Sequence, residues 1–128
     1  MSASHVVFRS EGYGIEGRLA IGGARAVVVT HPHPLYGGDM DNEVVTAITA
    51  AFAQAGYTTL HFNFRGVGRS EGRYGDGVSE QADVCAAVDY LKDCGYADVE
   101  LSGYSFGAWV NALCAGSRLP GIRLTMVA

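Results

Sequence analysis

Residues 99–107 read Val99-Glu100-Leu101-Ser102-Gly103-Tyr104-Ser105-Phe106-Gly107. The first part has the pattern of a strand, and residues 106–116 have the pattern of a helix. Between them lies a G-x-S-x-G motif, in which a strand turns sharply into a helix with the serine at the apex. We predict that Gly103 and Gly107 are required because a side chain at either position would strike a neighbouring strand or helix. The alternative is an unreactive serine in a glycine-rich turn.

Strand-like and helix-like segments alternate along the chain. The patterns predict helices over 43–55, 79–93 and 106–116, and strands over 6–9, 15–21, 24–30, 58–64, 99–104 and 122–127. Asp41 or Asn42 is expected to cap the first helix, and Ser79 the second. The alternation predicts a three-layer α/β/α fold with a mostly parallel sheet and an antiparallel N-terminal edge. Such a sheet places its chemistry at the carboxyl ends of the strands.

A second motif follows the third predicted strand and reads His31-Pro32-His33-Pro34-Leu35-Tyr36-Gly37-Gly38-Asp39-Met40-Asp41-Asn42. A nucleophilic serine needs backbone N–H groups that stabilise the oxyanion formed by its attack. Phe106, at the start of a helix, offers the first. Pro32 and Pro34 have no N–H, which leaves His33 and Leu35 as candidates for the second. We prefer Leu35, because His33-Pro34-Leu35 occupies the place of a His-Gly-x turn.

The same motif contains an H-x-H pair, His31 and His33, that could bind zinc or act as a base. No cysteine, Asp or Glu completes a metal site at short range, so we expect no metal and a structural or substrate-lining role. Tyr36, Tyr74 and Tyr104 could line a pocket or pack in the core. We predict that His33, Tyr36 and Tyr104 line the substrate.

A third motif reads Phe62-Asn63-Phe64-Arg65-Gly66-Val67-Gly68-Arg69-Ser70-Glu71-Gly72. Because it follows a predicted strand, the dinucleotide fingerprint G-x-G-x-x-G must be considered. Glu71 stands where the third glycine should be, and no helix begins at once, which disfavours nucleotide binding. We instead predict a tight loop beside the active site that Arg65 holds by hydrogen bonds.

The composition sets further limits on function. The chain has 128 residues, which fit one domain, and a net charge of −4 without a basic stripe, so we expect no nucleic-acid partner. The start Met1-Ser2-Ala3-Ser4-His5 does not resemble a signal peptide, and no apolar run approaches the roughly 20 residues that cross a bilayer. The three cysteines are odd in number and widely spaced, typical of free thiols, which favours a cytoplasmic protein. We expect no cofactor and no membrane association.

Taken together and in this order, the three motifs resemble the α/β-hydrolase superfamily, and within it the small, lidless, dienelactone-hydrolase-like serine hydrolases. The resemblance covers roughly Val6 to Val127. It implies a Ser–His–Asp triad in the chain order serine, acid, histidine. Ser105 carries over as the nucleophile, Phe106 as an oxyanion donor and Leu35, less directly, as the second donor. The acid and the histidine follow later strands in this family and have no counterpart here.

The chain stops in an apolar run, Ile122-Arg123-Leu124-Thr125-Met126-Val127-Ala128. We expect residues 1–128 to form one α/β-hydrolase domain that is incomplete at its C-terminus, the alternative being a true short protein. The expected function is hydrolysis of a small-molecule carboxylic ester, thioester or related acyl substrate through an acyl-enzyme on Ser105. This chain alone is expected to be inactive. The alternative function is a non-catalytic protein of this fold that binds a ligand or partner.

Overall fold

The computed structural model describes residues 3–128, so Met1-Ser2 of the segment that argued against a signal peptide lies outside the described residues. All the predicted helices and strands are present, with ends that shift by a few residues, and a short 3-10 helix is added. None of the helices within residues 3–128 is both long and apolar enough to cross a bilayer. In chain order the elements are β1 (Ser4–Ser10), β2 (Tyr13–Ala20), β3 (Arg25–Thr30), η1 (Pro34–Tyr36), α1 (Glu43–Gln54), β4 (Thr58–Phe62), α2 (Glu80–Asp93), β5 (Asp98–Tyr104), α3 (Phe106–Ser117) and β6 (Leu124–Val127).

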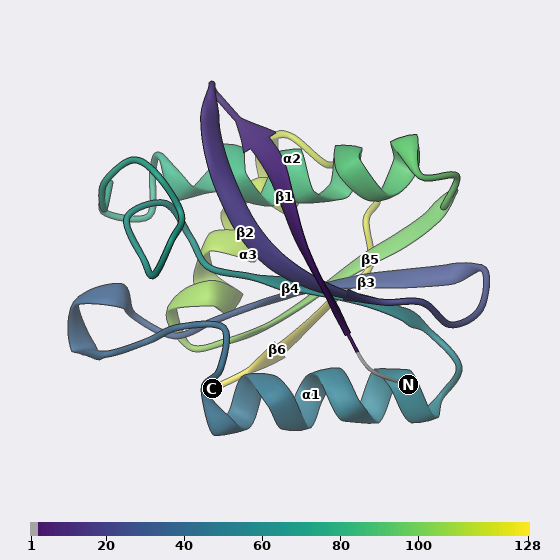
Figure 1. Cartoon of the computed structure of the whole chain (residues 1–128). Coiled ribbons are helices and arrows are strands. Elements are labelled where there is room, and N and C mark those ends of the chain that lie inside the picture. The colour runs from purple at the N-terminus through teal and green to yellow at the C-terminus, as the bar shows by residue number, and fades with distance from the viewer. Residues whose placement is uncertain (1–2) are drawn as a thin grey trace.

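The strands form one sheet in the order β1-β2-β4-β3-β5-β6. The β1–β2 and β2–β4 pairs are antiparallel, and β4, β3, β5 and β6 are parallel to one another. Helix α1 covers one face of the sheet, and α2 and α3 cover the other (Figure 1). The predicted three-layer architecture and the antiparallel N-terminal edge are therefore confirmed.

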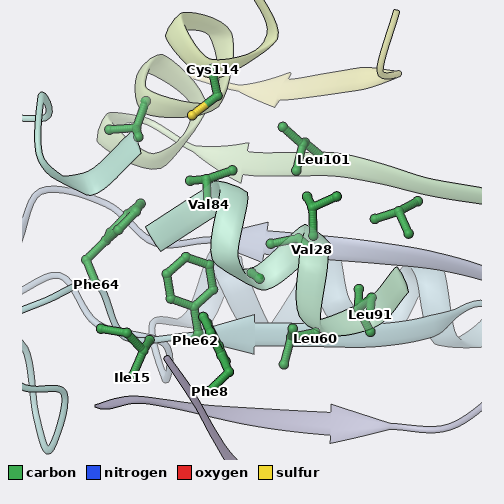
Figure 2. Packing of buried hydrophobic residues seen from close by; sticks show 14 of the residues in the cluster. Phe8, Ile15, Val28, Leu60, Phe62, Phe64, Val84, Leu91, Leu101 and Cys114 are labelled. Atoms are coloured by element: carbon green, nitrogen blue, oxygen red, sulfur yellow. The ribbon is translucent and has the colours of Figure 1, made fainter. Parts of the chain in front are cut away.

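Strand β3 lies in the middle of the sheet and is buried on both faces. Its Val27 and Val29 pack with Val45 of α1, and Ile48 and Phe52 lie against this cluster. On the opposite face, residues of β3, β4 and β5 pack against α2 in a larger cluster (Figure 2) that includes Val28, Leu60, Phe62, Val84, Leu91 and Leu101. Burial on both faces explains why β3 is a continuous apolar run rather than an alternating one.

The helix starts differ in how they are capped. The side chain of Asn42 accepts hydrogen bonds from the N–H groups of Val44 (2.9 Å) and Val45 (3.3 Å), so Asn42 rather than Asp41 caps α1. The prediction that Ser79 caps α2 is wrong, because its side chain makes no capping hydrogen bond. The N–H groups of Gln81 and Ala82 donate to the Val78 and Ser79 carbonyls instead, and the Glu80 carboxylate binds N–H groups of the preceding loop.

Candidate functional site

Ser105 lies between the end of β5 and the start of α3, at the carboxyl edge of the parallel strands. Its backbone is at φ 55° and ψ −113°, a left-handed conformation that is unusual for a residue with a side chain. The Ser105 N–H donates to the Val127 carbonyl of β6 (2.9 Å), and its carbonyl accepts from the N–H of Trp109 (3.0 Å). Strained residues of this kind persist only where surrounding contacts hold them. The predicted bend is therefore present, with Ser105 exposed at its apex.

The glycines on either side of Ser105 are packed against the end of β3. A Cβ at Gly103 would overlap the Thr30 hydroxyl and lie 2.8 Å from the Ala108 nitrogen. A Cβ at Gly107 would lie 2.7 Å from the carbonyl oxygen of His31. The neighbouring strand and helix thus come too close for a side chain, as the sequence motif predicted.

Replacing Gly107 with alanine is expected to lower the free energy of unfolding by about 1–3 kcal/mol, because the added methyl group meets backbone atoms that have to shift. Gly116→Ala is the matched control: Gly116 lies in the same helix, and a Cβ there has no atom within 4 Å. That control should be neutral or stabilising by up to about 1 kcal/mol. Urea unfolding of both variants makes the comparison. Equal stability of the two variants would contradict the proposed steric requirement.

Two polar side chains stabilise the backbone just before the bend at Ser105. Asn111, fully buried on α3, donates through Nδ2 to the Ser102 carbonyl (3.0 Å), and the Thr30 hydroxyl approaches the same oxygen (3.5 Å). Their convergence ties β3, β5 and α3 together just before the serine. Neither Asn111 nor Thr30 was predicted from the sequence as a site residue. The available signal was an asparagine inside the apolar pattern of a helix.

The second motif folds into η1 between β3 and α1. The Leu35 N–H donates to His33 Nδ1 (3.2 Å) within the turn, while the Leu35 side chain is exposed. The His33 carbonyl accepts from the N–H of Gly38 (3.0 Å), which doubles the loop back. For the His33 N–H, no hydrogen-bond partner is found within residues 3–128. The two N–H groups that the sequence left open as oxyanion donors therefore differ: that of Leu35 is engaged and that of His33 is not.

The histidines His31 and His61 hold loops together. His31 is fully buried; its Nδ1 donates to the Pro32 carbonyl (2.7 Å), and its Nε2 accepts from the Phe64 N–H (3.1 Å). Burial lowers its pKa from 6.5 to about 4, so the ring is neutral near pH 7. His61 Nδ1 donates to the Met40 carbonyl (2.9 Å), and burial lowers its pKa as well. Both rings are engaged with backbone groups, which fits the structural role expected of His31.

Arg65 anchors the third motif, as the sequence predicted. Its Nη2 donates to Asp83 Oδ1 and to Glu11 Oε1, both at 2.9 Å, and its Nε donates to Asp83 Oδ1 (3.1 Å). Both Arg65 and Asp83 are buried, and Ser10 Oγ adds a hydrogen bond to the same carboxylate (2.7 Å). The arginine thus joins the loop after β4 to α2 and to the β1–β2 hairpin.

A second carboxylate, Glu16 of β2, holds the other side of this loop. Its Oε2 accepts from the Arg69 N–H (2.6 Å) and from Asn63 Nδ2 (2.9 Å), and Asn63 Oδ1 accepts from the Met40 N–H (2.8 Å). Burial acts to raise the pKa of Glu16, but hydrogen bonds from Arg69 and Asn63 leave it below its usual value. The network fixes the second and third motifs relative to each other.

The predicted substrate-lining residues lie at different places. His33 and Tyr36 are in ring contact, with centroids 4.8 Å apart, and the Tyr36 side chain is exposed. Tyr104 is the last residue of β5 and is partly buried. Tyr74, which the sequence left open as a pocket or core residue, forms a hydrogen bond to His33 Nε2 (3.1 Å). It also borders a cavity of about 320 Å³ between the second and third motifs, whose lining includes Leu35 and Val67 but not Ser105.

Comparisons with known proteins agree with this arrangement. Residues 21–128 match the family model described as X-Pro dipeptidyl-peptidase (S15 family). An uncharacterised protein of Rickettsia prowazekii is 44% identical over 101 residues, which make up 75% of this chain and 42% of that protein.

Solved structures are similar over nearly the whole chain. A serine hydrolase homologue from Coxiella burnetii is 35% identical, with a TM-score of 0.85 over 92% of this chain and 59% of its own. A putative α/β hydrolase from Agrobacterium tumefaciens is 34% identical, with a TM-score of 0.88 over 96% of this chain and 59% of its own. A serine hydrolase without a lid from Xanthomonas campestris is 28% identical, with a TM-score of 0.88 over 98% and 61%. The fold is that of the α/β hydrolases, the resemblance to lidless serine hydrolases is confirmed, and the chain spans about 60% of these structures.

Proposed function

Since this chain belongs to the X-Pro dipeptidyl-peptidase (S15) family, we propose that it carries the nucleophile of a serine hydrolase that acts on a carboxylic ester, thioester or related acyl compound. The family and the fold support hydrolysis in general. The observation that carries the finer proposal is Ser105, exposed at the apex of a strained bend with the start of α3 directly behind it. A serine in this position presents its hydroxyl oxygen to a substrate, because the bend restricts the directions in which the serine side chain can point.

In the proposed reaction, Ser105 Oγ attacks the substrate carbonyl carbon as a histidine takes the hydroxyl proton. The carbonyl oxygen becomes an oxyanion, which accepts hydrogen bonds from backbone N–H groups and lies at the positive end of the α3 dipole. The oxyanion then collapses and expels the alcohol or thiol, which takes the proton from the histidine. Water then attacks the acyl-enzyme while the histidine takes its proton, and the histidine returns that proton to Ser105 Oγ as the acid leaves.

We assign the first oxyanion donor to the N–H of Phe106 and the second to the N–H of His33. His33 replaces the predicted Leu35, whose N–H already donates within its own turn. The ring of His33 packs on that of Phe106, with centroids 4.8 Å apart, so the second motif adjoins the start of α3. Proximity, and an N–H without a hydrogen-bond partner in the described part of the chain, together support His33.

The histidine and the acid of this reaction are proposed to come from outside these 128 residues. His31 and His61 already use ring nitrogens to bind backbone carbonyls, and burial lowers the pKa of both rings, which makes them weaker bases. The chain also spans only 59% of the Coxiella burnetii structure and 42% of the Rickettsia prowazekii protein. We therefore expect this chain alone not to turn over an ester.

Ser105→Ala in the product of the complete gene should abolish labelling by a fluorophosphonate, because the reagent phosphonylates the activated serine oxygen. Ser117→Ala is the control, since Ser117 lies exposed at the end of the same helix, and its labelling should match the unsubstituted protein. Labelling is measured by the mass of the modified peptide. Undiminished labelling of the Ser105→Ala variant would remove Ser105 from the mechanism.

A non-catalytic binding protein is the second candidate function. It is favoured by the engagement of both ring nitrogens of His31, and of His61 Nδ1, with backbone groups. It would be supported if the complete gene product resisted the fluorophosphonate while still folding.

A further inference from the structure

Four aromatic rings form a continuous row that includes Phe106, the residue after Ser105. Tyr36 packs on His33 (4.8 Å between centroids), His33 on Phe106 (4.8 Å) and Phe106 on Trp109 (6.0 Å). We call Tyr36, His33, Phe106 and Trp109 the aromatic row. It joins the second motif to the first turn of α3, where the Trp109 N–H donates to the Ser105 carbonyl. A substrate held at Ser105 would therefore lie next to these rings.

The row is held in place by the loop that precedes α2. The ring of Tyr74 packs on His33 (5.3 Å) and on Phe106 (6.1 Å), and its hydroxyl accepts a hydrogen bond from His33 Nε2, because Nδ1 already accepts from the Leu35 N–H. The backbone at Gly77 lies so close to the Trp109 ring that a side chain there would overlap it. These contacts fix the rings before any ligand arrives, which reduces the entropy lost on binding.

Solvent reaches the row at its two ends. Tyr36 is 87% exposed and Trp109 is 50% exposed, whereas Phe106 between them is 7% exposed and packs on Phe64 in the core. The rings are tilted against one another by 50° to 57°, so both faces and edges are presented. Aromatic ligands gain from such offset and edge contacts beyond the area that they bury.

Nearby charge does not favour an anionic ligand. Asp76 and Glu80 lie close enough to Tyr74 to raise its pKa together with burial, the leading cause. Arg65, the buried cation of the adjoining loop, is already paired with Asp83 and Glu11. An uncharged group therefore fits this surface better than a carboxylate.

We propose that the aromatic row selects an uncharged substrate that carries a planar aromatic ring beside its carbonyl. The proposal rests on the proposed function, because Ser105 defines where the carbonyl lies. It names a substrate class for that site, and the row, rather than the cavity between the second and third motifs, provides the specificity.

Trp109 makes the proposal testable without turnover, because it is the only tryptophan of the chain. The Ser105→Ala chain is titrated with methyl phenylacetate and, as a matched saturated analogue, with methyl cyclohexylacetate, while Trp109 fluorescence is recorded. The aromatic ester should bind about three- to tenfold more tightly, as expected for ring–ring contacts in addition to apolar burial. The preference should disappear in Phe106→Leu and in Tyr36→Leu.

Tyr57→Leu is the control, because Tyr57 packs on Phe52 on the α1 side of the sheet (4.9 Å between centroids), and it should keep the full preference. Circular dichroism of each variant checks that the fold is retained. Equal affinity for the two esters, no saturable change with either, or an unaltered preference in both row variants would overturn the proposal. Fluorophosphonate labelling tests the proposed function separately. If Ser105 is labelled but the aromatic ester is not preferred, only the proposed role of the aromatic row is refuted. If the aromatic ester is preferred but Ser105 is not labelled, only the proposed hydrolase activity is refuted.

Discussion

Replacing Arg65 with leucine is expected to lower the free energy of unfolding by about 3–5 kcal/mol, the cost of leaving a buried charge without its partner. The Asp83 carboxylate is fully buried and would keep only the hydrogen bonds from the Arg65 N–H (2.9 Å) and Ser10 Oγ (2.7 Å). The loop after β4 would also lose its links to α2 and to Glu11. Both effects act in the same direction, so this variant should be among the least stable single substitutions in the chain.

Arg18→Leu is the matched control. Arg18 pairs with Asp41 at 2.7 Å, but both side chains are largely exposed, so its loss should cost no more than about 1 kcal/mol. Chemical denaturation of the two variants measures the difference. In the double variant Arg65→Leu/Asp83→Leu much of the lost stability should return, because no unpaired charge remains. An Arg65→Leu variant as stable as Arg18→Leu would show that the buried pair does not hold the loop.

Acidification from pH 7 to below pH 4 is expected to cost about 3 kcal/mol through His31 alone. Its pKa is about 4 in the folded protein and 6.5 when unperturbed. Between these two values the unfolded chain binds a proton at this residue and the folded chain does not, so protonation favours unfolding. Stability is therefore full above pH 6.5 and falls as the pH drops toward 4; below that, this residue adds no further loss. About 2 kcal/mol of the change falls between pH 7 and pH 5.

The measurement compares unfolding free energies at pH 7 and pH 5 for the native chain, His31→Gln and His5→Gln. Glutamine can still accept from the Phe64 N–H but does not titrate, so His31→Gln should lose most of the pH dependence. His5 is half exposed and serves as the control. His61 acts in the same direction as His31, whereas Glu16, whose pKa is lowered, acts only at more acidic pH. An unchanged pH dependence in His31→Gln would refute the assignment.

The fold could be predicted almost completely from the sequence because its signals are local. The continuous apolar run of β3, the helical stripe of α2 and the glycine-flanked Ser105 each reflect contacts with an immediate neighbour. The capping of α2 could not be predicted in the same way: Ser79 has the right residue type, but its backbone is already helical (φ −66°, ψ −33°) and its side chain makes no capping hydrogen bond. The backbone conformation of the residue before a helix depends on the preceding loop, which the residue type alone does not determine.

The site was predicted in part. The strained bend at Ser105 and the anchoring by Arg65 follow from residue type and spacing. The state of the Leu35 N–H does not, since it depends on how the ring of His33 turns within its own loop. The aromatic row likewise joins residues from one loop and a helix, and its members carry no shared sequence pattern. Contacts between distant segments are the part that only the folded chain reveals.

During synthesis, a ribosome adds the whole of α3 before it adds Val127. The Ser105 N–H depends on the Val127 carbonyl, 2.9 Å away, to hold its strained backbone. A nascent chain that has emerged only as far as α3 therefore contains every residue of the G-x-S-x-G motif without the strand that holds the serine outward. We expect the Ser105 backbone to reach its strained conformation only when β6 has paired with β5, so the bend forms late in the folding of this part of the chain.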